Sequence, residues 1–428
     1  MGYVRLNVLV VPSIWNPNVR SEGEFLTPST NARRSWHVRA NGLVFLYALL
    51  GLLTLVGPVH FAAHRWLVVH LFLLGAVTNA IVTWTEHFTI TLLRVPQPSR
   101  RQAGRRLAAL NLAVIATLVG VSIANSELII VGAGLLMLVI AIHGYNLHRL
   151  SNRALQNRFA GTVHFYLVAA TCLLLGVVFG ALSAFQKDGS VLRDSLHVAH
   201  LHANLLGWVG VTVMGTLFTF WPTVLRTKMV DGVMKSAKRS LPFLFTGISV
   251  AAISLAMNQR YIAIFGMILY ALGIGFVSRP FIRTWRQKAP RDLATVSIFC
   301  SALWLSLGVL SDLVALTLGR SLSDYVSWVD RFIPAFLMGF VGQILVGALT
   351  FLVPVILGGG PAAVRGHIKR LSSVWRTRIF LFNVGAVFTI FEGRIAQIGY
   401  GLLAVSLGFF IILVLKSVRA ERGNARAV

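Results

Sequence analysis

Apolar stretches of about 18 or more residues recur along the chain from Asn41 to Leu415, and short polar connections separate them. A helix of roughly 20 apolar residues crosses the hydrocarbon core of a bilayer and satisfies its own backbone hydrogen bonds there. The pattern therefore predicts an all-α, polytopic membrane protein with about 12 transmembrane helices. The predicted spans are 41–60, 66–90, 107–124, 127–147, 162–184, 196–222, 241–257, 260–280, 293–317, 332–357, 377–391 and 394–415.

One of these apolar segments recurs at a fixed spacing. The segment HLFLLGAVTNAIVTWTEHFTITLLR begins at His70, and HANLLGWVGVTVMGTLFTFWPTVLR begins 132 residues later at His202. A second step of the same length reaches a third segment, GFVGQILVGALTFLVPVIL, which begins at Gly339. The spacing predicts three four-helix repeats. The predicted divisions are a cytoplasmic segment 1–35, repeats 36–150, 151–288 and 289–416, and a basic cytoplasmic tail 417–428.

Several positions coincide when the repeats are superimposed on this spacing. The coincident positions are His70/His202, Leu73/Leu205, Leu74/Leu206, Gly75/Gly207, Arg94/Arg226, Gly207/Gly339, Val209/Val341, Gly210/Gly342, Gly215/Gly347, Leu217/Leu349 and Pro222/Pro354. The glycines of these helices are expected to let neighbouring helices approach closely. The third position equivalent to His70 and His202 is Pro334, so the third repeat lacks that histidine.

Charged residues make up only 12% of the chain, against about 25% in soluble domains. The net charge is nevertheless +26, and the basic residues gather in every second connection. Basic connections mark the cytoplasmic side, so we expect a plasma-membrane protein with both termini in the cytoplasm. The charge predicts contact with membrane lipid and not with nucleic acid. The basic segments are 94–106, 148–158, 226–239, 283–291, 365–378 and 416–426, and they alternate with 124–127, 186–194, 319–331 and 392–394.

This topology sorts the 12 histidines by side. Six are expected at the outer face, namely His60, His64, His70, His197, His200 and His202. Four form a looser inner group, namely His87, His143, His148 and His164. The remaining two, His37 and His367, lie in cytoplasmic segments and are expected to be ordinary flanking residues.

The outer histidines are the candidate ligands. Neutral imidazole suits copper, iron and zinc, and an ionisable residue within a membrane span suggests function by default. His197 and His200 share a helix face, whereas His200 and His202 are about 160° apart and cannot easily bind one ion from a regular helix. The candidate cofactor ligands are His70, His202 and His200, and the candidate metal ligands are His197, His200, His202, His60 and His64. The alternative is that these histidines cap helix ends or bond to loops.

Other polar residues in the spans have two interpretations each. Glu86 could carry protons or pair with an arginine. Asp312 and Asp330 could hydrogen-bond ligand histidines or cofactor groups, and the alternative is pairing with Arg331. The residues Asn79, Asn204, Trp84, Trp208 and Gln343 are expected to pack helices or line a pocket, and Cys172 and Cys300 to be core residues. None of them identifies a catalytic residue.

Twelve spans in three repeats, with histidines at the outer ends of spans two and six, resemble subunit I of the heme-copper oxidases. That superfamily includes the nitric-oxide reductases and NnrS-type membrane proteins. The segment HLHANLLGWVG, beginning at His200, looks like the histidine-rich helix of small subunit-I-like bacterial proteins. The segment HLFLLGAVTNAIVTWTEHF, beginning at His70, is similar to the membrane part of proteins fused to a copper nitrite reductase-like module. The resemblance covers about residues 36–416.

This resemblance implies roles for individual residues. His70 occupies the place of the span-two ligand of a low-spin heme, and His202, or His200, the place of a span-six copper ligand. The oxidases also use two histidines in span ten and two adjacent histidines in span seven, and both spans lack histidine here. The resemblance therefore implies heme b or copper without a standard binuclear centre. The implied partner is a periplasmic or extracellular cupredoxin or nitrite reductase-like redox protein.

Three functions remain open on the sequence alone. The first is a heme- or copper-binding membrane protein that handles electrons, nitric oxide or oxygen at the outer face. The second is a transporter or channel for metal ions or protons, with the two histidine groups as entry and exit stations. The third is a cofactor-free membrane assembly subunit. No Walker loop, Ser/His/Asp arrangement or HExxH motif is present, so ATP-driven and hydrolytic chemistry have no support.

Overall fold

The computed structural model describes residues 30–57, 64–154, 159–358 and 360–424, and their regular structure is helical throughout. Three short π-helical segments, labelled η, interrupt the α-helices. In chain order the elements are α1 (Thr30–Val56), α2 (His64–His70), η1 (Leu71–Val77), α3 (Thr78–Leu93), α4 (Arg100–Ser122), α5 (Ser126–Asn152), α6 (Ala160–Ala184), α7 (Val191–Leu201), η2 (His202–Val211), α8 (Thr212–Leu225), α9 (Val233–Ala256), α10 (Arg260–Gln287), α11 (Leu293–Leu318), α12 (Leu322–Phe336), η3 (Leu337–Gly342), α13 (Gln343–Leu357), α14 (Gly360–Leu371), α15 (Trp375–Phe388) and α16 (Gly393–Asn424).

Eleven helical segments in the described ranges are long and apolar enough to cross a membrane. By this criterion the chain has the character of a multi-pass membrane protein. The prediction of about 12 spans differs from this number by one helix, α15, which lies between α14 and α16 and is too short to be counted. The predicted span 377–391 corresponds to α15, which has only 14 residues. At 1.5 Å per residue it reaches about 21 Å, short of the ~30 Å hydrocarbon core. The reason is local: Arg376 and Arg378 occupy the first turn of α15, and Glu392 follows it closely.

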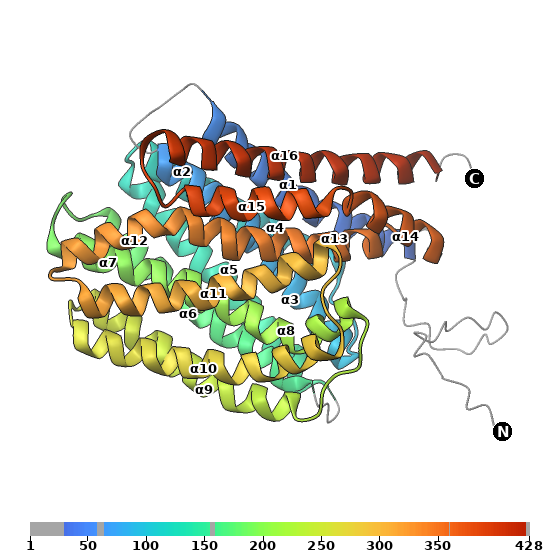
Figure 1. The fold of residues 1–428 in the computed structure, drawn as a ribbon, viewed down its shortest axis with the longest axis horizontal. Coiled ribbons are helices and arrows are strands. Elements are labelled where there is room, and N and C mark those ends of the chain that lie inside the picture. The colour runs from blue at the N-terminus through green and yellow to red at the C-terminus, as the bar shows by residue number, and fades with distance from the viewer. Residues whose placement is uncertain (1–29, 58–63, 155–158, 359, 425–428) are drawn as a thin grey trace.

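Successive long helices run in opposite directions, so their connections alternate between two ends of the bundle (Figure 1). The connections at the right of Figure 1 carry the basic segments, α1 begins there and α16 ends there, and we call this the basic end. The opposite end holds α2 and α7 with the histidines from His64 to His70 and from His197 to His202, and we call it the histidine end. The alternation of basic and non-basic connections in the sequence thus separates the two ends of the fold.

Three composite spans form the centre of the bundle. These central helices are α2–η1–α3, α7–η2–α8 and α12–η3–α13, and 61%, 83% and 72% of their apolar windows are buried, against 28–56% in the other spans. Each contains a π-helical segment near its middle. A π-helical turn carries an extra residue and shifts the helix face that follows, and such turns are frequent at functional sites. The central helices therefore share one backbone irregularity at corresponding places.

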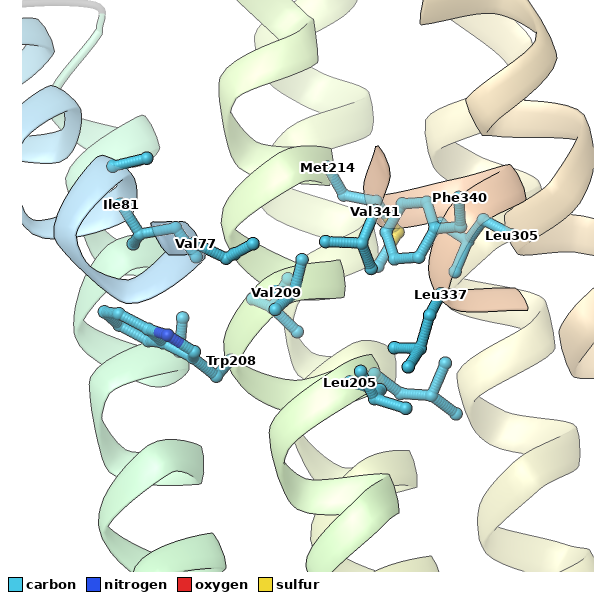
Figure 2. Close-up of a cluster of buried hydrophobic side chains, with 14 of the residues drawn as sticks. Val77, Ile81, Leu205, Trp208, Val209, Met214, Leu305, Leu337, Phe340 and Val341 are labelled. Atoms are coloured by element: carbon cyan, nitrogen blue, oxygen red, sulfur yellow. The ribbon is translucent and has the colours of Figure 1, made fainter. Parts of the chain in front are cut away.

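Two further features recur on the 132-residue spacing. Figure 2 shows Val77, Val209 and Val341 from the three central helices in one buried cluster, and none of them is more than 3% exposed. Each central helix also ends at a residue with positive φ, 54° at Arg94, 53° at Arg226 and 71° at Gly358. Arg94 and Arg226 share the left-handed helical conformation, with ψ of 40° and 53°, whereas Gly358 has ψ of −136°. Positive φ is uncommon for arginine, so its recurrence at equivalent positions reflects a shared ending of the first two central helices.

Glycines allow neighbouring helices to approach the central helices closely, as predicted. A Cβ at Gly207 would lie 2.5 Å from Cys172 Cβ, and one at Gly339 would lie 2.2 Å from the Trp304 ring. Cys172 and Trp304 are themselves 132 residues apart, so the second and third central helices contact their preceding helices in the same way. The free Cys172 is buried, which confirms it as a core residue, and the free Cys300 is partly buried.

We expect Gly339→Ala to destabilise the protein by about 1–3 kcal/mol, because the added methyl group would overlap the buried Trp304 ring. Gly134→Ala is the matched control, since nothing lies within 4 Å of a Cβ there and alanine favours the helix over glycine. Chemical unfolding of the purified protein in detergent measures both changes. Equal stability of the two variants would contradict the close helix contact at Gly339.

Candidate functional site

Two histidines from different central helices face each other at the histidine end. His70 is the last residue of α2 and His200 lies in the last turn of α7. Their ring centres are 6.1 Å apart and their planes differ by 24°. His70 Nδ1 lies 2.9 Å from the Trp66 carbonyl oxygen, and His200 Nδ1 lies 2.8 Å from that of Gly176. A carbonyl can only accept, so each Nδ1 carries the proton and each Nε2 keeps its lone pair.

The surrounding residues hold both rings in place. The Trp66 ring stacks on the His70 ring with centres 4.0 Å apart. The backbone at Gly180 approaches His200 so closely that a Cβ there would lie 2.5 Å from its Nδ1. Asn204 Nδ2 lies 3.1 Å from Nδ1 and 3.3 Å from Nε2 of His200. The His200 ring is thus enclosed by a small residue and an amide, while an indole covers the His70 ring.

The separation of the two rings matches that of two ligands of one metal ion. A metal–imidazole bond is about 2 Å and the ring nitrogen lies roughly 1 Å from the ring centre, so ligands on opposite sides of an ion have centres about 6 Å apart. His70 and His200 meet this distance with centres 6.1 Å apart. Ligating histidines usually donate their other N–H to a carbonyl or carboxylate, as both do here. The donor set fits either axial ligation of heme iron or copper.

His202, which the sequence also proposed as a ligand, is engaged in other contacts. Its Nδ1 lies 2.7 Å from the Val198 carbonyl oxygen, and its Nε2 lies 3.0 Å from Asp312 Oδ2. The Tyr325 hydroxyl donates to Asp312 Oδ1 at 2.7 Å and lies 3.3 Å from His202 Nε2. His202 is thus held by a carbonyl oxygen and a carboxylate, whereas the Nε2 of His200 has only the neutral Asn204 amide at 3.3 Å. The ring of His200 is also the one that lies beside His70, so the geometry favours His200 over His202 as the companion of His70.

The contact between His202 and Asp312 requires a shared proton. Because His202 Nδ1 donates to a carbonyl, a neutral ring would present a lone pair at Nε2. A lone pair and a carboxylate oxygen do not approach to 3.0 Å without a proton between them. The pair therefore holds one proton, and it is buried, with side chains 5% and 13% exposed.

The predicted hydrogen bonds between aspartates and histidines are both present. Asp312 bonds His202, and Asp330 Oδ1 lies 3.4 Å from His197 Nε2 in a half-exposed pair. The alternative partner, Arg331, instead pairs with Glu392 at 3.1 Å. These hydrogen bonds do not show that His202 or His197 binds a metal.

The remaining outer candidates do not converge on one point. His64 Nε2 lies 2.8 Å from the Thr54 carbonyl oxygen, and His197 pairs with Asp330. His60 lies outside the described residues. Within the described ranges, no three His, Cys, Asp or Glu side chains form a group that could hold a metal ion. The described outer histidines are thus divided among several contacts, with His70 and His200 as one pair.

The four inner histidines also lie apart. His143 is buried and its Nε2 lies 3.0 Å from the Thr85 hydroxyl. His148 contacts the Asn152 amide at 3.0 Å on the exposed surface, and His164 is exposed. These three side chains have separate surroundings in separate helices or helix turns.

His87, the fourth inner histidine, packs against a residue that the sequence treated as an ordinary flank. Its ring meets the His37 ring edge-on with centres 4.8 Å apart, and the Trp84 ring at 5.3 Å. Nearby, Glu86 pairs with Arg106 at 2.6 Å, which confirms the arginine alternative for Glu86. The sequence offered no signal for the contact between His37 and His87, because they come from different helices.

Comparison with known proteins adds no assignment. No protein-family model matches this sequence, and no curated protein matches it. The functional argument therefore rests on the residues and their geometry.

Proposed function

We propose that the protein binds a redox metal, as heme b or as copper, between His70 and His200 at its outer face. One observation carries the proposal: two imidazole rings have centres 6.1 Å apart, and each Nδ1 is held by a backbone carbonyl, which leaves the lone pair on Nε2. A metal would replace the Asn204 amide, which lies 3.3 Å from the Nε2 of His200. Neutral imidazole nitrogen suits both iron and copper. The two half-buried rings are held by their carbonyl contacts and by Trp66 and Asn204, which keeps the donor atoms in fixed positions.

The two possible metals predict different activities. A heme held by His70 and His200 would supply one-electron transfer, whereas copper held by the same two imidazoles would supply redox chemistry with nitric oxide or oxygen. The protein residues hold the ligand rings: Trp66 covers His70, and Asn204 and Gly180 enclose His200. In both cases the chemistry class is redox chemistry without a standard binuclear centre.

We further propose a relation to heme-copper oxidase subunit I, built as three repeats around the central helices. The π-helical segments, the left-handed helix endings and the shared valine cluster support three equivalent units. The basic end would then face the cytoplasm, with both termini, and the histidine end would face outward. An outward metal site would exchange electrons with a soluble cupredoxin or nitrite reductase-like protein.

A reduced-minus-oxidised absorption spectrum of the purified protein, with iron and copper quantified on the same sample, tests the proposal. A b-type α-band with stoichiometric iron would establish the heme form. Stoichiometric copper without a heme band would establish the copper form. Neither metal, after expression with heme and copper supplied, would contradict the proposal.

A further inference from the structure

A cavity lies on the side of the second central helix that carries His202. It encloses about 450 Å³ of empty space, its open mouth included, between η2, α11 and α12. The polar and aromatic part of its lining is His202, Ser311, Asp312, Trp328, Phe332 and Phe336. The rest of the lining is aliphatic side chains and one glycine. The cavity is therefore mainly apolar, with a few polar groups gathered in one place.

The polar groups of the cavity are arranged as hydrogen-bond acceptors. The Trp328 indole N–H donates a hydrogen bond to Ser311 Oγ at 3.1 Å, so it does not donate to the Asp312 carboxylate. Tyr325 holds Asp312 Oδ1, and His202 holds Oδ2. Each carboxylate oxygen has a second lone pair, and Asp312 lines the cavity. A ligand that offers a hydroxyl would find a fixed, buried acceptor there.

Aromatic side chains form part of the apolar wall of the cavity. Phe332 and Phe336 line the cavity, and Trp328, which is 48% exposed, lies at its rim. Aromatic walls prefer flat aromatic guests, which pack against them edge-to-face or offset. All lining residues belong to helices long and apolar enough to span a membrane, so a guest would arrive through the lipid phase.

We propose that this cavity binds the ring of a lipid-soluble phenol, the class that includes hydroquinones, with its hydroxyl donating to Asp312. An anion would meet the carboxylate, and a pure hydrocarbon would leave the acceptor lone pairs unpaired. A phenol satisfies both requirements, since its ring fills apolar space and its single donor meets an acceptor. This inference concerns binding alone and does not rest on the metal proposed between His70 and His200.

The test is calorimetric titration of 4-decylphenol into the protein in lipid nanodiscs, with empty nanodiscs subtracted. We expect saturable binding of the phenol, and binding of its methyl ether, 4-decylanisole, at least about tenfold weaker, because the ether lacks the donor. Asp312→Asn keeps the shape of the side chain but removes its charge, and should weaken phenol binding by about tenfold or more. Asp188→Asn is the matched control, an exposed aspartate paired with Arg193 away from the cavity.

A second variant guards against a folding defect in Asp312→Asn. Ile333→Trp enlarges a lining residue without touching the polar groups, and should abolish phenol binding while the metal content stays unchanged. Equal affinity for the phenol and its methyl ether would overturn the proposal, as would full binding by Asp312→Asn or Ile333→Trp. If the wild-type protein binds the phenol but contains no metal, that result contradicts the proposed function and leaves the phenol site intact.

Discussion

His70→Ala and His200→Ala are each expected to lose the bound metal, to below about a tenth of the wild-type content. Each substitution removes one of two donor atoms, and a single imidazole holds a metal far less tightly than two fixed ones. Iron and copper analysis of the purified variants, together with the reduced-minus-oxidised spectrum, measures the loss. The effect should be similar in both variants, since each ring would supply one of the two ligands.

The neighbouring histidine provides the control for this expectation. His202→Gln should retain the metal, because both nitrogens of His202 are already bonded to Val198 and Asp312. His148→Ala, at an exposed position near the basic end, should also retain it. Retention of metal by His200→Ala together with its loss from His202→Gln would show that the ligand had been assigned to the wrong histidine.

Asp312→Leu is expected to destabilise the protein by about 3 kcal/mol or more, because it leaves His202 buried without its partner. Removing both members of a buried pair costs much less than removing one, since no unpaired polar group remains. The double variant His202→Leu/Asp312→Leu should therefore be more stable than Asp312→Leu. Chemical unfolding in detergent, analysed as a double-mutant cycle, measures the coupling between the two residues.

The control for this cycle is the exposed pair of Arg331 and Glu392. Those side chains are 59% and 80% exposed, and solvated pairs contribute about 0–1 kcal/mol. Glu392→Leu should therefore change stability little. A coupling energy between His202 and Asp312 as small as that of the exposed pair would contradict the shared proton inferred from their geometry.

The helical, multi-pass character of the fold could be predicted because lipid permits few alternatives to a long apolar helix. The recurrence of glycine, valine and proline at one spacing also predicted where central helices would approach their neighbours. The position of α1 against the first central helix did not follow this prediction. Gly75 meets Tyr47, whereas the equivalent of Cys172 on the same spacing is Ala40, so α1 is shifted by about two helical turns. That shift lies in a neighbouring helix, and the aligned segments of the central helices carry no signal of it.

The pairing of His70 with His200 could be predicted only in part. Both residues were candidates, yet the spacing made His202 the equivalent of His70 and the natural companion. When similar segments pack head to tail, one face of the first contacts a different face of the second. Residues at equivalent positions in the sequence therefore need not contact each other. His70 meets His200, and His202 turns toward Asp312 in α11. The sequence did place His200 and His202 on opposite helix faces, which agrees with their separate partners.

Tyr325 and Trp66 were not predicted from the sequence as residues of the site. Neither belongs to a recognisable motif, and each matters through a contact with another residue: Tyr325 with Asp312, and Trp66 with His70 in the next helical turn. The spacing of Trp66 and His70, four residues apart on one helix, was the available signal for that stack. Contacts between distant helices, such as that of Tyr325, follow from packing alone.

X-ray absorption at the edge of whichever metal the purified protein contains tests the central claim most directly. The account predicts imidazole scattering from two nitrogen ligands at about 2 Å, reduced in His70→Ala and in His200→Ala. A metal bound without imidazole, or an unchanged imidazole signal in both variants, would contradict the assignment of His70 and His200 as its ligands.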